Sequence, residues 1–458
     1  MKPIVKKEFK TLLPAQEIYE GIKGIYPESS FLNSSYGRRG IMRQSYIGCD
    51  LFLKFRSRGN KSEIIEKSSV KKTSGNPLDA LSRIIKSNKI NIDSNEDFIA
   101  GGIGYFSYDL KNIIEKLPRS VLDDICVPDI CFNFYKTILV ICEGKPGKVT
   151  AYFSKPENDL EKRQKLLEEI FICGGAAVPA PFHFCVKKPV SNFTKAGYMA
   201  AVKKIKRYIK EGDIFQACLS QRFETVFKSD PWLLYKKLNL INPAPYSAYL
   251  DLKEFKILSS SPELFLKVGK GIIETKPMKG TINRGLNKIE DRVLKKKLKE
   301  SSKDTAELLM IVDLERNDLG KICELGSVKV TRHRKIEKYA SVFQTTSTVK
   351  GRLINPELDI EKIIRATFPG GSISGCPKIR AMEIIDEIEP TARGIYTGSI
   401  GYISFHKTMC LNMAIRIMIV KDNKVYFQVG GGIVADSKPE SEYEETLTKA
   451  KALIESLS

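Results

Sequence analysis

Short apolar runs separated by tight turns fill the second half of this chain, and they restrict the folds that it can form. Runs of strand length occupy residues 214–220, 255–260, 264–268, 271–275, 398–405, 411–420 and 424–429. Turn residues such as Gly269-Lys270-Gly271 lie between neighbouring runs, as is typical of β-hairpins. Helical patterns lie between or after the strand-like runs. The sequence therefore predicts an α+β fold with mainly antiparallel sheets.

A segment rich in small residues divides the chain. Residues 174–189 concentrate Gly, Ala and Pro, which favour irregular structure. A helix is predicted to follow, capped by Asn192 or Thr194. We therefore divide the chain into an N-terminal region, residues 1–190, and a second region, residues 191–458.

The composition narrows the class of protein. The chain has 458 residues and no apolar run of transmembrane length. Its ten Cys include no C-x-x-C pair and it has only three His, which disfavours both a zinc site and a disulfide scaffold. The start of the chain lacks the apolar segment of a secretory signal. We therefore expect a globular protein of the cytoplasm with no membrane partner.

The net charge of +21 has two explanations. One is nucleic-acid binding, and the other is a Lys-rich composition spread over solvated faces. The basic residues are dispersed, and no stripe of aromatic and basic residues accompanies them. This pattern favours the second explanation, with some attraction of a small anionic substrate. We therefore predict no nucleic-acid partner.

Lys279 is the first candidate for catalysis. It lies in the run Pro277-Met278-Lys279-Gly280-Thr281, and a glycine lets a ligand approach the main chain closely. A lysine in a pocket can act as a nucleophile if its pKa is lowered. A solvated loop lysine is the alternative at this point.

Glu263 is the second candidate. Folding the chain back about Lys270 is predicted to place Lys279 opposite Ser261, within two residues of Glu263. A carboxyl group that is buried among apolar neighbours has a raised pKa and can donate a proton. A cross-strand ion pair on a solvated sheet face is the alternative.

Two acidic segments of helical character form a third constellation. Asp304 and Glu307 share one helix face, and Glu442, Glu445 and Lys449 share another. Each face could offer one carboxylate to Mg²⁺, which accepts few protein ligands together with water and substrate oxygens. Solvated charges at helical spacing are the alternative.

Glycine-rich segments could hold an anion. Residues 368–378 lead into a helical pattern, and a Gly/Ser loop at a helix N-terminus presents N–H groups to an anion. Residues 430–432 follow a strand, and Arg416 is predicted to lie on the strand before it, where it could pair with a carboxylate. Tight turns without a ligand are the alternative.

Together these motifs resemble one family, the chorismate-utilising enzymes, which includes anthranilate synthase component I, aminodeoxychorismate synthase component I, isochorismate synthases and salicylate synthases. The order and spacing of the matching runs hold from about residue 190 to the end of the chain. The N-terminal region matches less densely, through residues 31–34 and 101–109. The matching runs are residues 212–216, 260–263, 277–281, 313–320, 369–378, 396–398, 414–416, 430–437 and 442–449.

The resemblance implies a two-layer antiparallel β-sandwich with helices on the outside, in which residues 191–458 bind chorismate and Mg²⁺. It implies that Glu307 and Glu445 are the metal ligands and that Asp304 and Glu442 hold the waters of the metal. Glu263 resembles the general acid that protonates the departing C4 hydroxyl group. The implied chorismate contacts are Gly280, Thr281, Tyr396, Arg416, Gly430, Gly431 and Lys449.

Two positions distinguish the members of the family. Members that add water have a lysine that activates the water at the position where this chain has Gln216. Because an amide cannot act as a base, Gln216 disfavours isochorismate and salicylate synthesis. Anthranilate synthases have Ala where this chain has Lys279, whereas aminodeoxychorismate synthases have Lys. The resemblance therefore implies amination of chorismate to 4-amino-4-deoxychorismate through a covalent lysine intermediate, on the branch to 4-aminobenzoate and folate. Anthranilate synthase component I, on the tryptophan branch, is the alternative.

Gln344 is a departure from the family pattern. Many members have His at this position, three residues before the Ser of a Ser-Thr-Val run. A neutral amide can hydrogen-bond the substrate but cannot transfer a proton at neutral pH. This disfavours anthranilate formation, and we predict that Gln216 and Gln344 both contact the substrate.

The resemblance also implies partners. Ammonia is expected from a glutamine amidotransferase on a separate chain, because no second module with a Cys-His-Glu triad is evident. Residues 31–34, including Ser34, resemble a segment that lines a tryptophan pocket in this family, and residues 242–246 belong to the same region. Tryptophan is therefore a possible ligand. The non-enzyme alternative is a basic nucleic-acid-binding protein on the same fold, which salt-sensitive DNA binding without chorismate binding would support.

Overall fold

The structure is a computed structural model that describes residues 4–35, 43–67, 69–92, 94–118, 121–143, 147–154, 159–173, 184, 186–339 and 342–458. The predicted linker at residues 174–189 lies largely outside these residues. Hydrogen bonds join 22 strands within the described part of the chain, and every pair of neighbouring strands is antiparallel. None of the described helices is both long enough and apolar enough to cross a membrane.

Two long strands, β3 (Arg43–Arg58) and β7 (Ile130–Glu143), connect the two layers of the fold. They pair with each other along most of their length. One half of β3 and one half of β7 pair with strands of the first layer, and the other halves pair with strands of the second layer. The first-layer partners are β2 (Ser30–Asn33) and β8 (Val149–Ser154), and the second-layer partners are β4 (Lys61–Glu66) and β6 (Gly101–Phe106).

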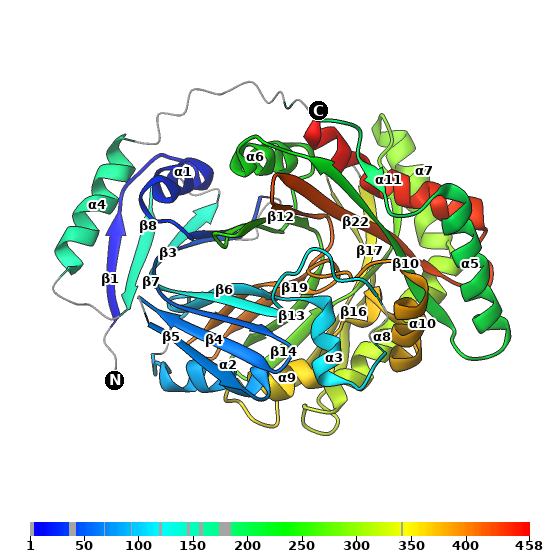
Figure 1. Cartoon of the computed structure of the whole chain (residues 1–458), viewed down its shortest axis with the longest axis horizontal. Helices are drawn as coiled ribbons and strands as arrows, with labels where there is room; N and C mark the ends of the chain where they lie inside the picture. Colours follow the sequence, from blue (N-terminus) through cyan, green and yellow to red (C-terminus); the bar gives the residue numbers. More distant parts are fainter. Residues whose placement is uncertain are drawn as a thin grey trace.

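The remaining strands extend each layer away from β3 and β7 (Figure 1). The first layer contains β9 (Val190–Ser191), β10 (Gln216–Val226), β22 (Lys424–Ile433), β21 (Ile417–Lys421), β12 (Phe255–Ser261), β11 (Tyr246–Asp251) and β1 (Ile4–Phe9). The second contains β5 (Ser69–Ser74), β19 (Ser399–Ser404), β20 (Met409–Met413), β13 (Leu264–Gly269), β14 (Ile272–Lys276), β17 (Val342–Arg352) and β16 (Lys329–Lys338). Two short additions are β15 (Met278–Asn283) on β17 and β18 (Gly375–Cys376) on β10.

Buried apolar side chains fill three spaces: one between the two sheets, and one between each sheet and the helices that cover it. Ile103 of β6 and Ile400 of β19 belong to the same buried cluster as Ile257 of β12 and Ile419 of β21, so this cluster fills the space between the two sheets. The other clusters lie between each sheet and its helices. The prediction of a two-layer antiparallel sandwich with helices on the outside is therefore confirmed (Figure 1).

The helices cover the outer faces of both layers. The first layer is covered by α1 (Ala15–Ile25), α4 (Leu160–Cys173), α6 (Pro231–Ile241) and α11 (Pro439–Leu457). The second is covered by α2 (Pro77–Ser87), α8 (Ser302–Gly320) and α9 (Ile360–Thr367). Helices α5 (Lys195–Lys210) and α10 (Lys378–Ile388) pack on the β10 end, with α7 (Lys288–Glu300) beside β15 and the short α3 (Lys111–Ile114) after β6.

Helix α5 begins where the sequence predicts it. The Thr194 side chain accepts a hydrogen bond from the Gly197 N–H, which satisfies one of the free donors of the first turn. Strands from both predicted regions pair with each other, since β2 pairs with β11 and β6 pairs with β19. The boundary at residues 190/191 stays a prediction.

The chain crosses between the layers at two neighbouring places. One crossing joins β12 to β13 through Glu263, and the other joins β20 to β21 through residues 414–416. The Met413 N–H donates to the Glu263 carbonyl at 3.0 Å, and the Ser261 hydroxyl donates to the Met413 carbonyl at 2.6 Å. The prediction of one strand over residues 411–420, with Arg416 inside it, is wrong. Arg416 has a φ of 55° in the crossing itself, where the chain leaves one sheet for the other.

Candidate active site

Lys279 lies on β15, and its position differs from the predicted hairpin register. Its cross-strand neighbour is Thr345 of β17, whereas Ser261 pairs with Tyr246. The prediction that Lys279 lies opposite Ser261 is therefore wrong. A bulge in β13 shifts the hairpin register, and Pro277, which has no N–H to donate, separates β14 from β15.

Glu263 and Lys279 are nevertheless neighbours. The Met278 N–H donates to the Glu263 carboxylate, and Lys279 lies close enough to affect its ionisation. Glu263 is 4% exposed, and its Oε1 accepts a hydrogen bond from the Ser372 hydroxyl at 2.7 Å. Burial raises the pKa of Glu263 to about 7, although the Ser372 hydrogen bond and the Lys279 charge act in the opposite direction. This carboxyl group can therefore both hold and release a proton near neutral pH.

Lys279 is held as an ammonium ion in this structure. Its Nζ lies 3.9 Å from Glu307 Oε2. Burial alone would lower the pKa of Lys279, but acidic groups around it outweigh burial and raise the pKa. These groups are, in decreasing order of effect, Cys218, Glu307, Glu263 and Glu445. A neutral Lys279 therefore requires that its proton move to another group of the site.

The acidic faces of α8 and α11 meet beside Lys279. Lys303 Nζ lies 3.9 Å from Glu307 Oε1 of α8 and 3.9 Å from Glu442 Oε1 of α11, so one cation bridges the two helices. Glu442 also accepts a hydrogen bond from the Ser437 hydroxyl at 2.6 Å. Burial raises the pKa of Glu442. Burial also acts to raise the pKa of Glu445, but Lys449 at 2.7 Å, together with Lys303 and Lys279, outweighs it and lowers that pKa. Glu307 and Glu442 are therefore largely shielded from solvent where the two helices meet, whereas the Glu445 side chain is half exposed and pairs with Lys449.

This donor set fits Mg²⁺. Among the described residues, no three or more His, Cys, Asp or Glu side chains are grouped closely enough to hold a metal ion by themselves. Mg²⁺ is usually bound through one or two carboxylates, with waters and substrate oxygens as the other ligands. Glu307 and Glu445 could supply the two carboxylates, and the Lys303 amine already lies between the two helices as a cation. The metal itself stays a prediction.

The glycine run at the end of β22 lies against the same residues. A side chain at Gly431 would lie 3.4 Å from Glu442 and 3.5 Å from Glu445. A side chain at Gly432 would lie 2.1 Å from Gln216 Nε2 and 3.3 Å from Lys279 Nζ. Only glycine therefore leaves the space beside Lys279 open.

Several other predicted contacts lie nearby. The Lys449 amine donates to the Gly430 carbonyl at 2.9 Å. Gly280 has a φ of 80°, and a side chain there would lie 2.9 Å from the Asp304 carboxyl carbon. These residues share one end of the sandwich with Lys279.

Two further pairs complete the predicted set. Gln344 is paired with Thr281 across β15 and β17, and its amide donates to the Thr281 hydroxyl at 3.3 Å. Tyr396 is buried and Arg416 is partly buried, and each affects the ionisation of the other. Desolvation lowers the pKa of Arg416, although Tyr396 acts in the opposite direction. The roles predicted for these residues stay predictions.

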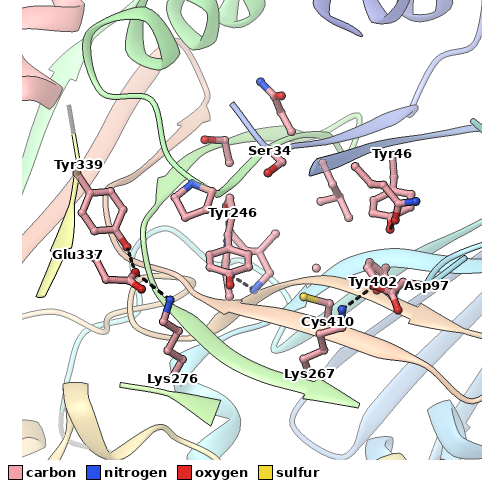
Figure 2. A pocket seen from close by; sticks show the side chains of 18 of the residues that line it. Ser34, Tyr46, Asp97, Tyr246, Lys267, Lys276, Glu337, Tyr339, Tyr402 and Cys410 are labelled. Atoms are coloured by element: carbon pink, nitrogen blue, oxygen red, sulfur yellow. Dashed lines mark hydrogen bonds and ion pairs between the residues drawn. The ribbon is translucent and has the colours of Figure 1, made fainter. Parts of the chain in front are cut away.

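Ser34 lies apart from this site, in a cavity of about 390 Å³ between the layers (Figure 2). The aromatic rings of Tyr46, Tyr246 and Tyr402 line the cavity. Charged groups in its wall are paired, with Lys267 2.6 Å from Asp97 and Lys276 2.9 Å from Glu337. An aromatic amino acid would fit this lining, and its binding here stays a prediction.

Three residues shape the site although no motif in the sequence indicates this role for them. Ser372 hydrogen-bonds Glu263, Lys303 bridges α8 and α11, and Cys218 of β10 lies close enough to Lys279 to affect its ionisation. Ser372 lies in the glycine-rich loop, where the sequence pattern indicates backbone N–H donors rather than this hydroxyl group. Cys218 had no sequence signal beyond the buried strand.

Glu315 of α8 is a buried carboxyl group behind the site, and it should make stability depend on pH. Burial raises the pKa of Glu315 from 4.5 to about 8, although a 2.7 Å hydrogen bond from Thr275 acts in the opposite direction. Because the folded protein keeps a proton that the unfolded chain releases, the stabilising contribution of Glu315 is fully present below about pH 4.5 and is lost progressively as the pH rises to about 8.

Glu315→Gln should therefore reduce the loss of stability between about pH 5.5 and about pH 7.5 by on the order of 2 kcal/mol. Denaturant unfolding of the wild type and the variant at both pH values measures this difference. An identical loss of stability in both proteins would show that Glu315 ionises as readily in the folded protein as in the unfolded chain.

The chain matches proteins of known identity over most of its length. The family model described as chorismate binding enzyme matches residues 41–455. Anthranilate synthase component 1 of Aquifex aeolicus (strain VF5) is 37% identical over 438 residues, which cover 93% of this chain and 88% of that protein. Aminodeoxychorismate synthase component 1 of Escherichia coli (strain K12) is 35% identical over 446 residues, which cover 97% of this chain and 96% of that protein. The crystal structure of anthranilate synthase component I from Streptococcus pneumoniae TIGR4 has a TM-score of 0.78 and 32% identity, and the match covers 92% of this chain and 95% of that one. The motifs, the fold and these matches agree, and the chain belongs to the family of chorismate-binding enzymes.

Proposed function

We propose that this protein aminates chorismate at C4 and yields 4-amino-4-deoxychorismate, in a reaction that depends on Mg²⁺. The observation that carries the proposal is the position of Lys279, beside the buried Glu263 and 3.9 Å from Glu307. A lysine can serve as a covalent nucleophile, and a buried acid can supply the proton that a departing hydroxyl group needs.

Lys279 and Glu263 can be treated as a pair that shares one proton. The pKa of Glu263 is about 7 and the pKa of Lys279 is raised above its usual value, so the pair carries a single proton at neutral and moderately alkaline pH. When this proton lies on Glu263, Lys279 is neutral and Glu263 is an acid. The reactive form therefore has the same net charge as the resting form.

In the first half of the proposed reaction, Lys279 Nζ attacks C2 of chorismate. Both double bonds of the ring shift by one position, the C4–O bond breaks, and the proton of Glu263 converts the departing hydroxyl group into water. In the second half, ammonia attacks C4, both double bonds shift back and the C2–Nζ bond breaks. A proton of the incoming ammonia returns to the pair, so both residues are regenerated and pyruvate is not released.

Glu307 and Glu445 are the proposed Mg²⁺ ligands, with Asp304 and Glu442 beside them. A bound Mg²⁺ would neutralise these carboxylates and anchor a carboxylate of the substrate. Arg416 and Lys449 supply further positive charge for the anionic substrate, and the open backbone of Gly430 and Gly431 gives it room.

Anthranilate formation is the alternative, because relatives of both names match at similar identity. Lys279 favours C4 amination because it supplies a nucleophile of the protein itself. Gln344 favours it too, since an amide beside Thr281 cannot relay the proton that pyruvate loss would require. Incubating the protein with chorismate, Mg²⁺ and ammonium, then identifying the product by mass spectrometry, tests the proposal. Anthranilate with pyruvate as the product would overturn it.

We also propose that ammonia comes from a separate glutamine amidotransferase subunit. The purified chain should then use ammonium but not glutamine as its nitrogen source. Activity of the chain alone with glutamine would contradict this part of the proposal.

Gln216 is the proposed contact for ammonia. It is completely buried, and its Oε1 has no hydrogen-bond partner among the described residues, although its amide lies close to Lys279 above Gly432. An unpaired buried acceptor suits a small ligand that carries N–H donors.

Gln216→Met should raise the KM for ammonia about fivefold to tenfold, which corresponds to one lost hydrogen bond of about 1 kcal/mol. The fold should survive, because the lost oxygen has no hydrogen-bond partner in the part of the chain that the structure describes. Steady-state kinetics with varied ammonium measures the effect, and the KM for chorismate in the same variant is the control. A change confined to the chorismate KM would show that Gln216 serves the other substrate.

A further inference from the structure

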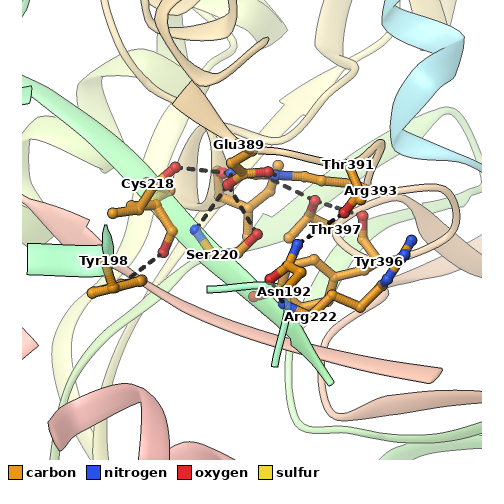
Figure 3. A network of polar contacts seen from close by, with 12 residues as sticks. Asn192, Tyr198, Cys218, Ser220, Arg222, Glu389, Thr391, Arg393, Tyr396 and Thr397 are labelled. Atoms are coloured by element: carbon orange, nitrogen blue, oxygen red, sulfur yellow. Dashed lines mark hydrogen bonds and ion pairs between the residues drawn. The ribbon is translucent and has the colours of Figure 1, made fainter. Parts of the chain in front are cut away.

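Arg393, between α10 and β19, uses all three nitrogens of its guanidinium group while it is 2% exposed (Figure 3). Nε and Nη2 donate to the two oxygens of Glu389 at 2.8 and 2.7 Å. Nη1 donates to the Ile373 carbonyl at 3.0 Å and to the Thr397 hydroxyl at 3.3 Å. Nη2 also donates to the Cys218 carbonyl at 2.8 Å. One side chain thus joins a helix end, a loop, a turn and a strand.

Glu389 extends this network along β10. Its Oε1 accepts hydrogen bonds from the Ser220 N–H at 2.8 Å and from the Ser220 hydroxyl at 2.9 Å (Figure 3). The strand is therefore held at Cys218 through its carbonyl and at Ser220 through its N–H, both by one buried ion pair. Such a bidentate pair fixes direction as well as distance.

The loop held by Arg393 is the one that carries the hydroxyl partner of Glu263. Ile373 directly follows Ser372, whose hydroxyl donates to Glu263 at 2.7 Å. The other side of this loop is bound to β10, because the Cys218 N–H donates to the Ser374 carbonyl at 2.8 Å and the Cys218 thiol lies 3.6 Å from the Ser372 carbonyl. Arg393 thus fixes both the loop and the strand against which the loop rests.

We propose that Arg393 and Glu389 are positioning residues that hold the Ser372 hydroxyl against Glu263. Neither residue contacts Glu263 itself in any hydrogen bond of the described structure; the pair acts through the Ile373 carbonyl and β10. The catalytic part of this inference rests on the proposed function, because it takes Glu263 as the acid. The positioning part does not, since it concerns the Ser372–Glu263 hydrogen bond in the protein alone.

The same helix offers a matched control. Asp386 lies three residues before Glu389 on α10, and it forms a buried 2.6 Å ion pair with Lys111 of α3. This pair ties α10 to α3 instead of to the loop of Ser372. If Arg393 and Glu389 served stability alone, disrupting either ion pair should have the same consequences.

The experiment compares Arg393→Lys with Asp386→Asn, and uses Ser372→Ala as the reference for loss of the hydroxyl. Infrared spectroscopy follows the carboxyl band of Glu263 against pH in each protein, with Glu263→Gln to assign the band. The charged groups that face Glu263, Lys279 on β15 and Glu315 on α8, are the same in all these proteins. Turnover with chorismate and ammonium is measured in parallel.

Arg393→Lys should move the titration of Glu263 to higher pH, as Ser372→Ala does, because the carboxylate loses a donor. It should lower kcat about 100-fold with little change in the KM for chorismate, as expected when a reacting group is misplaced by about 1 Å. Asp386→Asn should lose thermal stability but keep the wild-type titration of Glu263. If Arg393→Lys does not fold, Glu389→Gln, which keeps an acceptor for Ser220, takes its place with the same readouts.

A Glu263 titration in Arg393→Lys that matches the wild type would overturn the inference, as would an equal shift in Asp386→Asn. If the wild type makes a different product, the proposed function fails, but the infrared comparison still decides whether Arg393 positions Ser372.

Discussion

Lys279→Ala is expected to abolish the formation of 4-amino-4-deoxychorismate, with a loss of at least about 10³-fold in kcat, on the scale seen when a covalent nucleophile is removed. Without the amine, no bond to C2 can form and the C4 hydroxyl group keeps its place. Chorismate binding should remain, because the residues proposed to bind the carboxylates of the substrate are unchanged. Product analysis with ammonium and Mg²⁺ measures the loss, and calorimetry with chorismate measures binding.

Lys270→Asn is the control for Lys279→Ala. Lys270 is an exposed lysine at the turn of the neighbouring hairpin, where its φ of 51° suits asparagine. This variant should keep full activity. Mass spectrometry of the wild type incubated with chorismate but without ammonia should reveal a covalent adduct on Lys279. Full activity in Lys279→Ala would remove the covalent mechanism and with it the assignment to C4 amination.

Glu263→Gln is expected to lower kcat/KM for chorismate by about 10²-fold to 10⁴-fold, the range for loss of a general acid. An amide has nearly the shape of the carboxyl group but cannot receive the proton of Lys279 or pass it to the departing hydroxyl group. The Ser372 hydroxyl can still donate to the amide oxygen, so the local structure should survive.

The activity of the wild type should increase with pH, because the Glu263–Lys279 pair must lose one proton before it can react. At pH values below about 7, both Glu263 and Lys279 carry a proton, and the neutral amine is rare. As the pH rises through about 7, the pair loses one proton and the reactive form becomes available, so activity should rise and then remain level. Glu263→Gln should lack this rise. Measuring kcat/KM for chorismate from about pH 5.5 to about pH 9, at a fixed concentration of free ammonia, tests this.

Glu274→Gln is the control for this pair of measurements, because Glu274 lies on β14 and pairs with Lys350 at 2.8 Å, outside the site. It should retain both the activity and the rise. A wild-type profile that falls between about pH 6 and about pH 8 would contradict the shared proton, because it would mean that Lys279 is already neutral where Glu263 is still protonated.

Much of the fold could be predicted from local patterns. Alternating apolar runs and turn residues such as Gly269-Lys270-Gly271 predicted the antiparallel strands, and Thr194 marked the start of α5. The route of the chain between the two sheets could not be predicted in this way. Residues 411–420 look like one continuous strand, because apolarity along the chain is the same whether a run stays in one sheet or leaves it at Arg416. The crossing is decided by the β12–β13 connection beside it, which lies about 150 residues away in the sequence.

The candidate site was also predictable only in part from the sequence. Residue types and their spacing were enough to single out Lys279, Glu263 and the acidic faces of α8 and α11, and to place the chain in its family. The hairpin register was not predictable, because a bulge in β13 and Pro277 shift Lys279 from Ser261 to Thr345.

The sequence by itself thus determined which groups are available: an amine, an acid, carboxylates on two helices and glycines that leave space. Only the tertiary structure decided their state. Glu263 titrates near pH 7 because several segments bury it, and Lys279 holds its proton because acidic groups from β10, α8, α11 and the β12–β13 crossing surround it. Ionisation depends on neighbours in space, and here those neighbours come from distant parts of the chain.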